Sequence, residues 1–129
     1  MNETKTWSDS LVYCLNLNST LASIHDEATD NFLFNLSPGV FQGPTEEYWI
    51  GGVRTKPDPT RGEFRWVDQS PFDYTNWASG QPDNFGGIEN RVQVFKGKEP
   101  DGNTYEEPKW NDRPENTKMF FICQYNVCD

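Results

Sequence analysis

The sequence predicts an α+β fold in which two helices are followed by strands and long loops. Two observations predict it. Apolar residues recur at helical spacing ahead of Pro38-Gly39, whereas the later apolar runs are short and mostly alternate with polar residues. A chain of 129 residues has room for one hydrophobic core, so we expect a single domain over residues 1–129.

The two helices are predicted from capping and spacing. Thr6 can cap a helix over about residues 7–16, with Asp9 in its positive first turn. The apolar residues of this helix recur three or four apart: Trp7, Leu11, Cys14 and Leu15. The segment His25-Asp26-Glu27 opens a second helix, which Pro38-Gly39 ends. Its apolar residues are spaced by four: Ala28, Phe32 and Leu36.

The strands follow the second helix. A buried strand at 48–50 is expected to end at Gly51-Gly52, and the remaining predicted strands cover 63–67, 91–95 and 120–125. The segments 70–88 and 96–109 have no clear period, and loops of that length in a small domain are usually functional or disordered. We therefore look for function in these two segments.

Charge and composition exclude several classes of protein. The net charge of −9 argues against binding to nucleic acid, and it is compatible with either a solvated acidic surface or cation binding. No apolar run approaches the roughly 20 residues of a membrane span. No secretory segment follows Met1, so we expect a mature or excised chain. Asn-x-Ser/Thr triplets at Asn2, Asn18 and Asn35 slightly favour a secreted or extracellular protein.

Oxygen-bearing side chains cluster in and beside the long loops. They lie in Gln81-Pro82-Asp83, at Glu89 and in Trp110-Asn111-Asp112. Together they offer three carboxylates and two amides, the hard oxygen ligands that calcium takes at about 2.4 Å. Asp and Asn in loops also form turns without any ligand, so residue type alone leaves both interpretations open.

Further short motifs occur in one order along nearly the whole chain. They are Thr6-Trp7-Ser8-Asp9 with Cys14, Leu21-Ala22-Ser23-Ile24, Trp49-Ile50-Gly51-Gly52, Phe64-Arg65-Trp66, Asn76-Trp77 and Phe121-Ile122-Cys123. Together with the loop clusters, this ordered set resembles the C-type lectin family. The resemblance implies the C-type lectin-like fold, with two helices, antiparallel strands and a long calcium-binding loop region. It also implies a disulfide between Cys14 and Cys123.

The resemblance implies a carbohydrate site built on one calcium ion. The metal ligands would be Gln81, Asp83, Glu89, Asn111 and Asp112, with Pro82 in the cis form. The same five side chains would contact two sugar hydroxyls, and Phe85 could stack on the sugar ring. The order amide-Pro-acid resembles the galactose type of the family, so we expect binding of galactose or N-acetylgalactosamine.

The chain departs from the family pattern at several positions. Arg91 and Glu115 stand where a second disulfide usually lies, so we expect a salt bridge between them; the alternative is two unrelated surface charges. The acidic positions of the family's other calcium site are Pro57, Arg61, Asn84 and Asn90 here, which predicts a single calcium. The family's first strand is missing and Cys128 lacks a partner in the sequence. Either the domain is truncated or another element covers that edge, and Cys128 could bridge two chains, pair with an absent N-terminal cysteine or be a free thiol. We expect a homodimer that involves the N-terminal edge or the C-terminal segment, with Cys128 as a candidate link.

Other functions stay open at this stage. The main alternative is a protein-binding C-type lectin-like module without sugar recognition, and ice binding is a more distant one. We do not expect an enzyme. His25 is the only histidine and lies in the helical half, and no Ser or Cys has a plausible base beside it.

Overall fold

The computed structural model describes residues 4–36, 47–56, 63–82, 89–98 and 104–125. Its elements in chain order are α1 (Trp7–Asn16), β1 (Ser19–Leu21), α2 (Glu27–Leu36), β2 (Tyr48–Lys56), β3 (Glu63–Trp66), β4 (Arg91–Lys98), β5 (Thr104–Arg113), β6 (Phe120–Phe121) and β7 (Cys123–Tyr125). Two helices and a mainly antiparallel set of strands confirm the predicted fold class. None of the helices in these ranges is long and apolar enough to cross a membrane.

Helix α1 begins and ends where its sequence predicts. The Thr6 hydroxyl caps it by accepting a hydrogen bond of 3.2 Å from the backbone N–H of Asp9. Trp7 and Cys14 are buried, whereas Leu15 is exposed at the end of the helix. The buried side of α1 is therefore narrower than the predicted apolar stripe.

Helix α2 buries a different face from the predicted one. Phe32 and Leu36, which carry the predicted spacing of four, are 64% and 60% exposed. The helix instead buries Leu33 and Phe34 together with the acidic residue Asp30. The prediction was wrong because Asp30 looks like a surface residue in the sequence, whereas in the fold its carboxylate accepts hydrogen bonds from the core.

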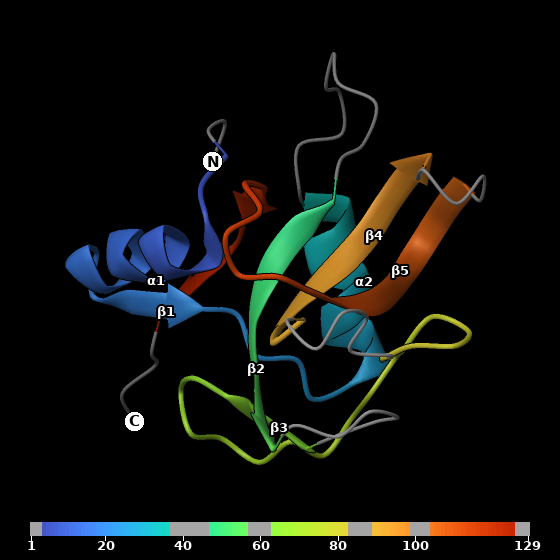
Figure 1. Ribbon diagram of the computed structural model, residues 1–129, viewed down its shortest axis with the longest axis horizontal. Coiled ribbons are helices and arrows are strands. Elements are labelled where there is room, and N and C mark those ends of the chain that lie inside the picture. The colour runs from blue at the N-terminus through green and yellow to red at the C-terminus, as the bar shows by residue number, and fades with distance from the viewer. Residues whose placement is uncertain (1–3, 37–46, 57–62, 83–88, 99–103, 126–129) are drawn as a thin grey trace.

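The main sheet has the strand order β3-β2-β4-β5, and each of these strands is antiparallel to its neighbour (Figure 1). Strand β6 lies parallel to β2. Strand β5 was not predicted, because most of it lies in the segment 96–109, which has no clear period. It forms one end of the strand order, a position that tolerates Pro108 because proline has no N–H for a ladder hydrogen bond.

Strand β2 is the centre of the hydrophobic core. Tyr48 and Ile50 pack in one buried cluster and Trp49 packs in another, as expected when successive side chains leave on opposite faces. The strand does not end at Gly51-Gly52 as predicted but continues to Lys56. These glycines allow close packing: a Cβ on Gly52 would lie 2.4 Å from the side chain of Val92.

The last predicted strand is divided in two by Ile122. Strand β6 pairs with β2, whereas β7 pairs antiparallel with β1. The sequence did not predict β1, whose three residues are all buried. Ahead of α1, Lys5 and Met119 exchange two backbone hydrogen bonds of 2.9 and 3.0 Å. Strand β7 is thus paired with β1, and Lys5 is paired with the backbone just before β6.

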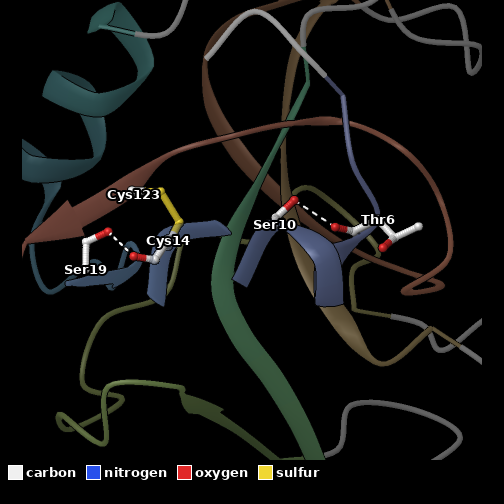
Figure 2. The surroundings of a disulfide bond; sticks show 5 residues. All are labelled: Thr6, Ser10, Cys14, Ser19 and Cys123. Atoms are coloured by element: carbon white, nitrogen blue, oxygen red, sulfur yellow. Dashed lines mark hydrogen bonds between the residues drawn. A yellow bond between two sulfur atoms is a disulfide. The ribbon is translucent and has the colours of Figure 1, made fainter. Parts of the chain in front are cut away.

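The predicted disulfide joins Cys14 of α1 to Cys123 of β7 (Figure 2). Cys14 is fully buried, and its carbonyl oxygen accepts a hydrogen bond of 2.7 Å from the Ser19 hydroxyl at the start of β1. One turn earlier in the helix, the Ser10 hydroxyl donates to the carbonyl of Thr6. The disulfide therefore connects α1 to β7, and the Ser19 hydrogen bond connects the same turn of α1 to β1.

Replacing both Cys14 and Cys123 by alanine should lower the free energy of unfolding by about 4–5 kcal/mol, because the bond closes a loop of roughly 100 residues in the unfolded chain. Their separation in the sequence is 109 residues. Guanidinium titration measures this loss. Ser19→Ala is the matched control, since it removes one neighbouring hydrogen bond and should cost about 1 kcal/mol. Equal losses in the two variants would contradict the assigned role of the disulfide.

Candidate functional site

Pairing of β4 with β5 brings several predicted site residues together. In this ladder Val92 lies opposite Asp112, and Gln93 lies opposite Asn111. Glu89 precedes the first residue of β4 by two positions, so it lies near the end of the same ladder. The predicted ligands Glu89, Asn111 and Asp112 therefore lie on or beside adjacent strands, although the sequence placed them in loops.

The segment 76–81, which leads to Pro82, is connected to β5 through backbone hydrogen bonds. The N–H of Trp110 donates to the carbonyl of Asn76 at 2.8 Å, and the N–H of Ala78 donates to the carbonyl of Trp110 at 2.9 Å. Gln81 then closes a turn by donating its N–H to Ala78. The Gln81–Pro82 peptide bond is cis, as the family resemblance implied. Gln81 is thus held close to the segment that carries Asn111.

Arg54 of β2 brings Glu89 and Asp112 to one point. Its Nη2 atom lies 2.5 Å from Oδ2 of Asp112, and its Nε donates to the backbone carbonyl of Glu89 at 3.1 Å. The side chains of Arg54 and Asp112 are 1% and 0% exposed, respectively. Arg54 was not predicted as a site residue; its one signal in the sequence was a basic residue two positions after the buried strand motif.

Asn111 is held by a different neighbour. Successive side chains of a strand leave on opposite faces, so Asn111 leaves β5 on the face opposite Asp112. Its Nδ2 donates to Oε1 of Gln93 at 2.9 Å in a buried position. Because the amide nitrogen is used in this bond, the carbonyl oxygen is the atom with which Asn111 could serve a metal. Gln93 is fully buried and was also missed from the sequence.

The remaining predicted site residues, Asp83 and Phe85, lie outside the described residues. Within the described ranges, no group of three or more His, Cys, Asp and Glu side chains is arranged to hold a metal. The four described candidates offer two carboxylates and two amides. Such oxygen donors suit calcium, and the carboxylate of Asp112 and the backbone carbonyl of Glu89 already lie against the positive charge of Arg54. The residues present therefore fit a calcium ion in donor chemistry.

Trp110, directly before Asn111, is anchored by a buried acid. Its indole N–H donates to the Asp30 carboxylate at 3.1 Å, and Nδ2 of Asn76 donates to the same carboxylate at 2.9 Å. Burial raises the pKa of Asp30, although the hydrogen bonds from Asn76 and Trp110 act in the opposite direction. Helix α2 therefore positions the start of the candidate site through one side chain.

Aromatic rings surround the same tryptophan. Four rings make edge contacts with Trp110, with centroids 5.6 to 6.2 Å away: Trp66, Phe72, Tyr74 and Trp77. Such packed aromatic pairs add to the stability that burial alone supplies. Three aromatic residues of the segment 70–88, which the sequence left without a period, thus pack against Trp110 of β5: Phe72, Tyr74 and Trp77.

The expected salt bridge between Arg91 and Glu115 is not among the ion pairs of the described residues. The Arg91 guanidinium lies 4.6 Å from the ring centroid of Trp7 and donates to the carbonyl of Asn90. Glu115 accepts from the Ser8 hydroxyl at 2.9 Å. Burial lowers the pKa of Arg91, while the charge of Glu115 acts to raise it. The two charges influence each other, but their side chains have nearer partners.

The chain belongs to the C-type lectin family: the family described as "Lectin C-type domain" matches residues 3–125. Domains of this family generally bind carbohydrate with calcium and are not enzymes. Consistent with that, His25 is an exposed residue paired with Asp73 at 2.9 Å. A curated relative, Salivary C-type lectin 2 from Aedes albopictus, is 32% identical over 132 residues, which cover 95% of this chain and 79% of that protein.

Solved structures share the fold. The C-type lectin CEL-I from Cucumaria echinata has a TM-score of 0.76 and 29% identity, covering 95% of this chain and 84% of that chain. A calcium-independent type II antifreeze protein has a TM-score of 0.72 and 25% identity, covering 94% and 78%. The fold alone therefore does not specify sugar binding or the use of calcium.

Asp30→Asn should change how stability depends on pH. The folded state holds the Asp30 proton more tightly than the unfolded state does. The contribution of this group to the free energy of unfolding therefore falls as pH rises from the ordinary pKa of 3.8 through the folded-state value. The variant lacks this decline.

Urea titrations between about pH 4 and pH 7 should thus show the variant gaining stability relative to wild type as pH rises. Glu107→Gln also replaces a carboxylate by an amide, at an exposed position of β5, and corrects for the lost charge. A constant difference between Asp30→Asn and wild type across this range would reject the raised pKa.

Proposed function

We propose that this chain binds glycans through one calcium ion held by Gln81, Asp83, Glu89, Asn111 and Asp112. The observation that carries the proposal is that Arg54 contacts both the buried carboxylate of Asp112 and the backbone carbonyl of Glu89, next to Asn111 on β5. When bound, calcium would supply a positive centre that takes two neighbouring sugar hydroxyls. Membership of the C-type lectin family supports this function.

The protein's own residues would orient the sugar. Carboxylates accept hydrogen bonds from hydroxyl groups, whereas amide nitrogens donate to them. The order Gln81-Pro82-Asp83 places an amide before the acid, as in the galactose type, which supports galactose or N-acetylgalactosamine as the ligand. Phe85 would cover the apolar face of the sugar ring.

Extracellular location and assembly are also part of the proposal. The disulfide between Cys14 and Cys123 is of the kind found in oxidising compartments, which supports a secreted or extracellular protein. Single lectin sites gain avidity when several act together, which supports a homodimer. Cys128, the residue proposed to link two chains, lies outside the described residues.

Calcium should raise the melting temperature, since it would bind the native loops and not the unfolded chain. At concentrations 100 to 1,000 times the dissociation constant, one site adds about 3–4 kcal/mol to the free energy of unfolding. Thermal melts in calcium and in EGTA measure the shift. Glu89→Gln should reduce it, whereas Glu106→Gln, the same change at an exposed position of β5, should leave it unchanged. Coincident wild-type melts would reject the calcium site.

Sugar preference should follow the residues that flank Pro82. The double change Gln81→Glu with Asp83→Asn exchanges donor and acceptor around the sugar. It should weaken galactose binding by about tenfold or more, the effect of a mismatched hydrogen bond, and admit mannose while calcium binding persists. Calorimetry with each sugar tests this, with Gln69→Glu plus Asp9→Asn, an exchange at exposed positions that also leaves the net charge unchanged, as the control. A wild-type protein that prefers mannose contradicts the galactose assignment.

A further inference from the structure

A buried arginine contacts two of the proposed calcium-binding residues. The side chains of Arg54 and Asp112 are 1% and 0% exposed, so both charges are removed from water. Burying such a pair costs free energy unless the geometry is good and further hydrogen bonds are made. Arg54 has these additional contacts: Nε donates to the carbonyl of Glu89, and the guanidinium lies 4.6 Å from the ring centroid of Phe64.

The backbone of the same residue reinforces this arrangement. The N–H of Arg54 donates to the carbonyl of Asn90 at 2.9 Å, so Arg54 binds two consecutive backbone carbonyls, those of Glu89 and Asn90, directly before β4 begins. A guanidinium stays charged at any physiological pH. Arg54 therefore supplies a permanent positive charge at the place where the carboxylate of Asp112 is buried.

We infer that Arg54 is a built-in cation that holds Glu89 and Asp112 in place in the calcium-free protein and shares Asp112 with the metal when calcium binds. This inference rests on the proposed calcium site. Two consequences follow from the charges. The calcium-free site keeps its shape because its buried carboxylate already has a counter-charge, and calcium binds less tightly because the guanidinium repels it.

Arg54→Met tests the inference, because it keeps the length of the side chain and removes the charge. Arg54→Lys keeps the charge and loses the fork that reaches both partners. The matched control is Arg113→Met on β5. Arg113 also pairs with a partly buried carboxylate, that of Glu47 at 2.8 Å, but it contacts none of the proposed ligands through that pair. Melting temperatures in EGTA and in saturating calcium, with calcium affinity from calorimetry, are the readouts.

We expect Arg54→Met to lower the melting temperature much more in EGTA than in calcium. Its calcium dissociation constant should fall on the order of tenfold, as expected when one nearby positive charge is removed. The melting temperature of Arg54→Lys in EGTA should lie between those of Arg54→Met and wild type. Arg113→Met should lower the melting temperature equally in both conditions. If Arg54→Met folds only when calcium is present, that result also supports the inference. The melting temperatures in EGTA and in calcium are then compared for Arg54→Lys and wild type.

Two results would overturn the inference. The first is an equal drop for Arg54→Met in EGTA and in calcium, which would mean that Arg54 contributes packing alone. The second is loss of calcium binding in Arg54→Met while wild type binds it, which would mean that Arg54 orients Asp112 for the metal. If wild type does not bind calcium, the proposed function fails separately. In that case binding by Arg54→Met supports the inference, and its absence overturns it.

Discussion

The hydrogen bond between Trp110 and Asp30 is the interaction on which the candidate site depends. The indole is fully buried and donates to a carboxylate that is itself fully buried on α2. Asn76 donates to the same carboxylate, and its carbonyl accepts from the backbone of Trp110. Residues from three distant parts of the chain thus meet at one side chain. A shift of Trp110 would leave a buried carboxylate short of donors, which is costly.

Around this anchor, each residue of the Asn111-Asp112 pair has its own buried polar partner. Gln93 of β4 holds Asn111, and Arg54 of β2 holds Asp112. Both partners belong to strands, and side chains on strands are positioned more firmly than side chains on loops. The protein therefore prepares these two positions with its own hydrogen bonds, and any ligand that enters meets groups already oriented by the sheet.

Local patterns predicted several parts of this arrangement. The Thr6 cap with the bounds of α1, and the buried strand at Tyr48, each depend on residues close together in the sequence. The disulfide and the cis form of Pro82 came from family resemblance, which carries information that spacing does not. Strand β5 was missed because its first half is charged and contains Pro108. The prediction of the buried face of α2 was wrong because Asp30 is buried and Phe32 is not.

The sequence by itself determined the class of fold, the family and the oxygen-bearing residues of the candidate site, because these are properties of residue type, order and local period. Only the tertiary structure decided which groups support those residues. Arg54 and Asp112 are 58 positions apart, and Asp30 and Trp110 are 80 apart. No local pattern encodes such pairs. They form because strand pairing and the packing of α2 against β5 bring them together, and because a buried charge without a partner would cost too much free energy to remain.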